Sequence, residues 1–88
     1  MEHESHPEIV KRLKRANGHL TSVIAMIEAG RPCVDLAQQL HAVEAAITNA
    51  KRALIHDHID HCLVDGIGPA HAPADAVLQE FRALTKYL

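Results

Sequence analysis

The stretch from Val34 to Val64 contains neither glycine nor proline, and it lies within the longest such run in this 88-residue chain. Apolar residues recur along it at alternating steps of four and three, which is the spacing of a heptad seam on one side of an α-helix. These residues are Leu36, Leu40, Val43, Ile47, Ala50 and Leu54. The run therefore predicts one helix of about 30 residues and about 45 Å, whose seam the rest of the fold has to cover.

Shorter helices are predicted on both sides of this run. Ser5 and Glu8 form a capping box, with Pro7 in the first turn, so the first helix should begin near Ser5. It should end at "AGRP" (residues 29–32), where glycine permits a left-handed conformation and proline prevents continuation. A loop with two glycines and two prolines separates the long helix from a third one after Pro73. The expected apolar stripes are Ile9, Leu13, Ala16, Leu20, Val23 and Ile27 in the first helix, and Val77, Leu78, Phe81, Leu84 and Leu88 in the third.

The predicted fold class is all-α, with three helices in one domain over residues 1–88. The chain is 48% hydrophobic but only 2% aromatic, which favours helices packed along long seams. A first helix of about 25 residues covers only part of the longer one in an antiparallel hairpin. A second copy of the chain is the simplest source of further cover, so the sequence predicts an antiparallel four-helix-bundle dimer or a higher assembly.

The chain shows no secretory signal, and its apolar runs are too short to span a membrane. We therefore expect no membrane partner and a cytoplasmic location, where two cysteines stay reduced and serve as ligands or redox groups. The net charge of −2 is not typical of a nucleic-acid-binding domain. A local basic patch can still bind phosphate, because salt screens charges beyond about 10 Å. The candidates are Lys11, Arg12, Lys14 and Arg15, followed by Lys51 and Arg52.

The two ends of the long helix carry residues that bind soft metals. His58 and Cys62 are four residues apart, so they share a helical face and can chelate one ion. Cys33 lies about 37 Å away along the same axis, but an antiparallel dimer brings it beside His58 and Cys62 of the partner. Two thiolates and an imidazole suit Cu(I), Zn(II), Ni(II) or Co(II). The alternative interpretation is a packed cysteine at one end and a solvated surface at the other.

Three segments resemble one protein family. "RLKRANGHL" in the first helix, "RPCVDLAQQLHAVEAAI" at the start of the second and "HDHIDHCL" at its end are similar to the CsoR/RcnR family of small bacterial transcriptional repressors. The resemblance implies dimers that pair into tetramers, bind double-stranded operator DNA without effector, and release it when the effector binds. It implies that Cys33, His58 and Cys62 are metal ligands and that the basic residues contact DNA. The chain has His19 where the family has a glutamine after the glycine.

The resemblance leaves the effector open. Copper sensors of the family use a Cys, His, Cys set and commonly have a tyrosine before the first cysteine, where this chain has Pro32. Nickel and cobalt sensors add an N-terminal ligand, for which His3 is our candidate, with His6 and the amine of Met1 as alternatives. We expect Ni(II) or Co(II) as effector, controlling metal efflux genes, with Cu(I) as the alternative.

Other functions fit the sequence less well. A persulfide or aldehyde sensor of the same family is one alternative, and a metal-storage module without DNA binding is another. An enzyme is not expected, and no catalytic residues are proposed, because the chain has no Ser/His/Asp set, no glycine-rich phosphate loop and no Glu-x-x-His pair.

Overall fold

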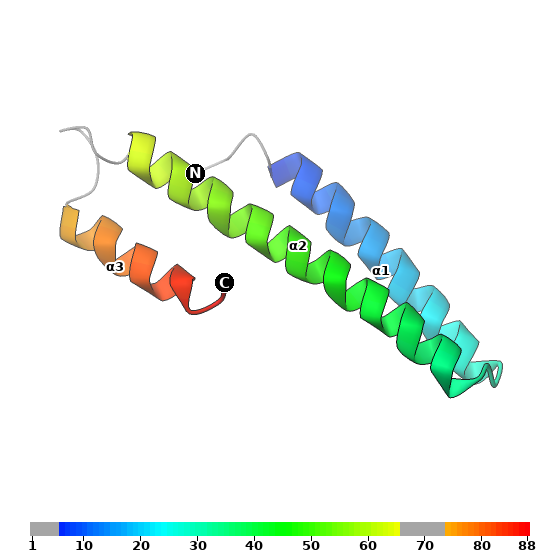
Figure 1. Cartoon of the computed structure of the whole chain (residues 1–88). Helices are drawn as coiled ribbons and strands as arrows, with labels where there is room; N and C mark the ends of the chain where they lie inside the picture. Colours follow the sequence, from blue (N-terminus) through cyan, green and yellow to red (C-terminus); the bar gives the residue numbers. More distant parts are fainter. Residues whose placement is uncertain (1–5, 66–73) are drawn as a thin grey trace.

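The computed structural model describes residues 6–65 and 74–88, except for the side chains of residues 62–65 and 74. All regular structure in this part of the chain is helical: α1 (His6–Glu28), α2 (Cys33–Asp65) and α3 (Ala74–Thr85). Helix α1 lies antiparallel along α2, and α3 folds back beside the C-terminal part of α2 (Figure 1). This confirms the predicted all-α fold with three helices. None of the helices so described is long and apolar enough to cross a membrane.

Gly30 and Pro32 set the turn between α1 and α2. Gly30 has φ = 76°, and its N–H donates to the carbonyl of Ile27 at 3.0 Å. The N–H of Arg31 donates to the carbonyl of Met26 at 3.1 Å, which completes a Schellman motif. The carbonyl of Pro32 then accepts the first hydrogen bond of α2, from Leu36 at 3.1 Å. The predicted end of the first helix is therefore confirmed. Its predicted cap, Ser5, lies outside the described residues.

The seam of α2 is divided into two parallel stripes. Val43 and Ala50 are buried, at 4% and 1% exposure. The residues that alternate with these two in the repeat are half-exposed and are seven residues apart from one another. They are Leu40 (42%), Ile47 (44%) and Leu54 (41%). Steps of four and three alternate between two neighbouring lines on a helix, and one helix packed alongside covers only one of these lines. The sequence predicted one continuous seam, whereas the hairpin buries half of it.

Helix α1 shows the same division. Ile9, Ala16 and Val23 are spaced by seven residues and are all buried, whereas Leu13 and Ile27 are 43% and 51% exposed. Across the hairpin, His19 Nε2 lies 2.6 Å from Oε1 of Gln39, which ties α1 to α2 near the turn. The apolar contact of the hairpin is therefore one heptad line from each helix, and a second apolar line of each helix is open.

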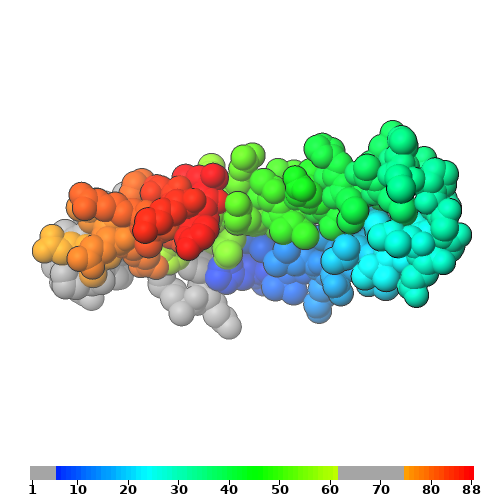
Figure 2. Space-filling model, turned by 90° about the horizontal axis from the view of Figure 1, so that it is seen from below, coloured from blue at the N-terminus to red at the C-terminus, as the bar shows by residue number. Residues whose placement is uncertain are grey.

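The chain has an elongated shape (Figure 2). Its principal extents are 59 × 23 × 14 Å and its radius of gyration is 17.8 Å. A compact domain of this length has a radius of gyration of about 12 Å. The elongation follows from the 33 residues of α2, which span about 50 Å without interruption. The hairpin is too thin to bury both stripes of α2 by itself.

Val23→Ala is expected to lower the free energy of unfolding by about 2 kcal/mol, because Val23 is fully buried between α1 and α2. The matched control is Val34→Ala, at a residue that is 69% exposed, where the change should stay within about 0.5 kcal/mol. Urea unfolding followed by circular dichroism measures both values. Equal effects of the two substitutions would contradict the assignment of the core.

Candidate functional site

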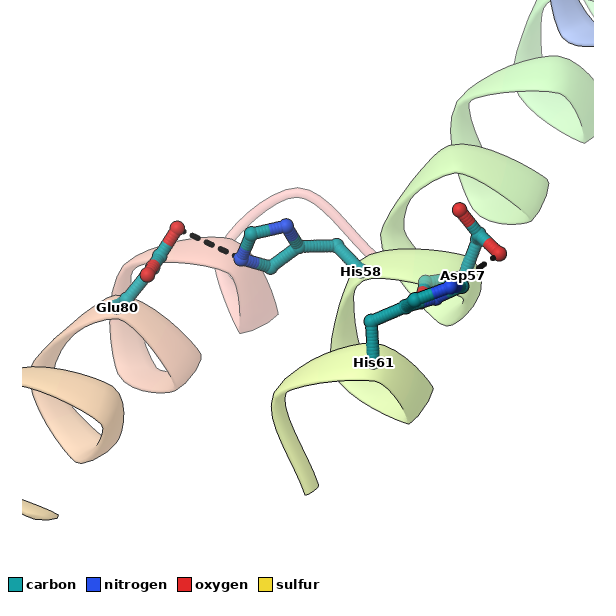
Figure 3. A network of polar contacts seen from close by, with 4 residues as sticks. All are labelled: Asp57, His58, His61 and Glu80. Carbon is teal, nitrogen blue, oxygen red and sulfur yellow. Dashed lines mark hydrogen bonds and ion pairs between the residues drawn. The ribbon is translucent and has the colours of Figure 1, made fainter. Parts of the chain in front are cut away.

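The last turns of α2 present His58 toward α3. His58 Nε2 lies 2.6 Å from Oε1 of Glu80, and the His58 side chain is 26% exposed (Figure 3). A carboxylate oxygen only accepts hydrogen bonds, so Nε2–H is the donor and the lone pair of the neutral ring is on Nδ1. A hydrogen bond from one ring nitrogen to a carboxylate is the usual support for a histidine that binds a metal through the other. Glu80 therefore orients His58 and favours the tautomer with its hydrogen on Nε2.

His61 has a different environment one turn later. Its Nδ1 lies 2.8 Å from the backbone oxygen of Asp57 and 3.3 Å from Oδ1 of the same residue. Both contacts stay within α2, and His61 lies back along the helix toward Asp57 rather than toward Glu80 (Figure 3). His58 and His61 thus point to different surroundings, and His58 is the one coupled to α3.

The predicted ligands do not meet within one chain. Cys33 is the first residue of α2 and is exposed, and the helix places His58 about 37 Å further along. Cys62 lies within α2, but its side chain is outside the description, as is the whole of His3. Among the described side chains, no three His, Cys, Asp or Glu residues are grouped closely enough to hold an ion. Any site containing both Cys33 and His58 therefore needs a second chain.

Cys33 and His58 both belong to the open side of α2. Cys33 continues the heptad line of the half-exposed stripe, seven residues before Leu40, and His58 follows Leu54 by one turn. We define the open stripe of α2 as Cys33, Leu40, Ile47, Leu54 and His58, of which His58 is only 26% exposed because it contacts Glu80 of α3. Its polar ends are predicted metal ligands and its middle is apolar, so a metal site and an apolar contact would share one face.

The basic residues of α1 fall on two sides of the helix. Lys11, Lys14 and Arg15 are exposed and form no ion pair within the described structure, and their face is opposite the buried stripe of α1. Arg12 lies to the side of this face, with Nε 3.9 Å from Oε1 of Glu8. On α2, Lys51 and Arg52 are exposed as well. The sequence presented four basic residues as one group, whereas the helix separates three of them from Arg12.

Two residues that contact the predicted site and the neighbouring helix could not be identified from the sequence: Glu80, the partner of His58, and Gln39, the partner of His19. Glu80 gave no signal, because its position beside His58 depends on how α3 docks on α2. Gln39 also gave none, although its side chain contacts His19, which stands where the family pattern has glutamine. No residue pattern reports such contacts between helices.

Comparison with known proteins gives consistent matches over almost the whole chain. A family model described as metal-sensitive transcriptional repressor matches residues 5–87. The copper-sensing transcriptional repressor CsoR of Bacillus subtilis (strain 168) is 36% identical over 91 residues, covering 98% of this chain and 90% of the relative. The copper-sensing transcriptional repressor RicR of Mycobacterium tuberculosis (strain ATCC 25618 / H37Rv) is 32% identical over 73 residues, covering 83% and 76%. The solved structure of the nickel-responsive transcriptional regulator InrS superimposes with a TM-score of 0.82 at 27% identity, covering 100% of this chain and 98% of that one.

Glu80→Ala is expected to loosen α3 from α2, because it removes the hydrogen bond from His58. Glu80 is half-exposed, so the loss should be about 0.6 kcal/mol, seen as about threefold faster amide hydrogen exchange in α3. Gln79→Ala, one residue earlier, serves as the control and should leave exchange unchanged. Unaltered exchange in Glu80→Ala would mean that this contact does not hold α3.

Proposed function

Because this chain belongs to the family of metal-sensitive transcriptional repressors, we propose that it binds operator DNA in its metal-free form and releases it on binding Ni(II) or Co(II). Members of this family are repressors and not enzymes. The proposed consequence of release is expression of metal efflux genes. The observation that carries the proposal is the open stripe of α2, which combines predicted metal ligands with an uncovered apolar line.

The open stripe defines its own pairing with a second chain. Two antiparallel α2 helices match apolar residues best when Ile47 faces Ile47 of the partner and Leu40 faces the partner's Leu54. In this register, residue numbers at the same level add up to 94, so Cys33 lies level with residue 61 of the partner. His58 is then within about 5 Å of that level along the axis and Cys62 within about 2 Å. The apolar register alone therefore supports a site shared between chains, and the two-fold axis generates it twice.

The donor set of this shared site fits a transition metal. Cys33 from one chain and His58 and Cys62 from the other supply two thiolates and one imidazole, the ligands of soft and borderline ions. Glu80 supports His58 in the tautomer that coordination through Nδ1 requires. For Ni(II) or Co(II) a fourth ligand is proposed from the N-terminus, with His3 as candidate. Similarity to the nickel-responsive regulator over the full length of this chain supports this choice.

Cu(I) is the second candidate effector. It needs only the three ligands Cys33, His58 and Cys62, and similarity to the copper-sensing repressors, including that of Bacillus subtilis, supports it. The two candidates differ in their dependence on His3. Removal of His3 should weaken Ni(II) binding but leave Cu(I) binding unchanged.

The proposed mechanism is a shift between two packings of one assembly. Cys33 follows directly after the turn that ends α1, so holding Cys33 against the partner's His58 constrains both the α1 hairpin and, through Glu80, helix α3. We propose that the resulting arrangement no longer places the basic faces of α1 against DNA. By linkage, DNA must weaken metal binding by the same factor by which metal weakens DNA binding.

The proposed contacts through which dimers form a tetramer are the exposed apolar residues of α3, which include Leu78 and Phe81.

Ile47→Cys, in a background of Cys33→Ser and Cys62→Ser, should form a disulfide-linked dimer under mild oxidation. The reason is that residue 47 faces itself across the proposed axis, within the roughly 7 Å between Cα atoms that a disulfide allows. Leu54→Cys in the same background is the register control, since its two copies would be about 21 Å apart along the axis. Non-reducing electrophoresis measures both. Equal cross-linking of the two variants would exclude this register.

Cys33→Ala should keep DNA binding and lose its release by metal, because Cys33 serves only the metal site in this proposal. Anaerobic titration of the reduced wild type with Ni(II) should give thiolate-to-nickel charge-transfer absorption that saturates near one ion per chain, and the variant should lack it. A wild type that gives no such bands with Ni(II) but binds Cu(I) at about one ion per chain, followed by ultraviolet Cu(I)–thiolate absorption, would move the assignment to copper. A folded Cys33→Ala variant that fails to bind DNA without metal would contradict the division of roles.

Lys14→Ala should weaken binding to all DNA sequences and reduce the slope of log K against log salt by about 1, because one phosphate contact is lost. Arg12→Ala should reduce the slope by less, since Arg12 lies beside the basic face and pairs with Glu8. Fluorescence anisotropy over a series of salt concentrations measures both. The proposed DNA-contacting face would be wrong if Arg12→Ala had the larger effect.

A further inference from the structure

Gly18 is an exposed glycine in the interior of α1, with more than two helical turns on either side. Glycine is among the residues least favourable to a helix interior. A Cβ atom added at Gly18 would meet no other atom within 4 Å, and its φ is not positive. Neither a turn nor close packing within the described chain accounts for this glycine.

The position of Gly18 on the helix links it to the basic face of α1. It follows Lys11, Lys14 and Arg15 by seven, four and three residues, so all four lie on one side of the helix. These three side chains are exposed and free of ion pairs within the described structure. At Gly18 the helix backbone is therefore not covered by a side chain, and the three basic side chains precede it on the same face.

We propose that Gly18 is the point at which α1 touches the sugar–phosphate backbone of DNA. The inference rests on the proposed repressor function and adds to it a residue that acts by being small. Without a Cβ atom, which would stand about 1.5 Å off the helix backbone, a phosphate can approach the helix surface. Lys14 and Arg15, one turn away, then reach the same strand at hydrogen-bonding distance, where contacts with phosphate are strongest.

The charge of this face favours DNA over a second copy of the chain as its occupant. A symmetric contact between two such faces would place Lys11, Lys14 and Arg15 against like charges, which is unfavourable. The apolar residues of α1 that a second copy would cover, Leu13 and Ile24, lie on another side of the helix. A polyanion is the partner whose charge complements this face.

The experiment compares Gly18→Ala and Gly18→Leu with Asn17→Ala. Asn17 is the exposed neighbour and points about 100° around the helix from Gly18. The probe is a fluorescein-labelled duplex that the metal-free wild type selects from a random pool. Gly18→Ala should raise Tm by about 5 °C, because alanine favours the helix, and should weaken DNA binding at least about tenfold. Gly18→Leu should bind still more weakly, and Asn17→Ala should bind within about twofold of the wild type.

Three results would overturn the inference while leaving the proposed function intact. These are a Gly18→Ala affinity within about threefold of the wild type, an equal loss in Asn17→Ala, or a loss of DNA binding accompanied by a changed sedimentation coefficient. The last would assign the face of Gly18 to contact between copies. A wild type that selects no duplex at all would instead contradict the proposed repressor function, and the inference with it.

Discussion

The unbroken length of α2 is the constraint on which the other features depend. A helix of 33 residues with a heptad seam presents two apolar lines, and the hairpin partner α1 covers one of them. Burial of Val43 and Ala50 beside half-exposed Leu40 and Ile47 is the direct evidence for this division. Since each half-exposed apolar side chain contributes on the order of 1 kcal/mol or more when it is covered, the open stripe strongly favours association with a matching surface.

The proposed function follows from what lies at the ends of that stripe. Cys33 and His58 are separated by most of the length of α2, so one rigid helix keeps them apart and an antiparallel pair brings them together. In the proposed dimer, association and metal binding depend on the same face, so a bound metal would change how the two chains pack. Glu80 connects this face to α3, because its carboxylate contacts His58.

The sequence predicted the helices well and their contacts only in part. Gly30 and Pro32 mark the first turn through local backbone preferences, which act on single residues and are readable in sequence. The division of the seam was not predictable in the same way, because it depends on which line of α2 faces α1. The bonds of His58 to Glu80 and of His19 to Gln39 depend on the docking of separate helices. The separation of Arg12 from the other basic residues has a different origin, because its pairing with Glu8 is an i,i+4 contact within α1 that the spacing of the two residues already indicates.

The central claim is that Cys33 and Cys62 of different chains bind one metal ion, and subunit mixing tests it most directly. Cys33→Ala and Cys62→Ala would each be titrated alone with Ni(II), or with Cu(I) if the wild type prefers it, and then again after unfolding and refolding as an equal mixture. The account predicts almost no thiolate-to-metal absorption in either variant alone. In the mixture, randomly assembled heterodimers should regain one complete site, or about one ion for every four chains. A mixture that binds no more metal than the separate variants would contradict a site shared between chains.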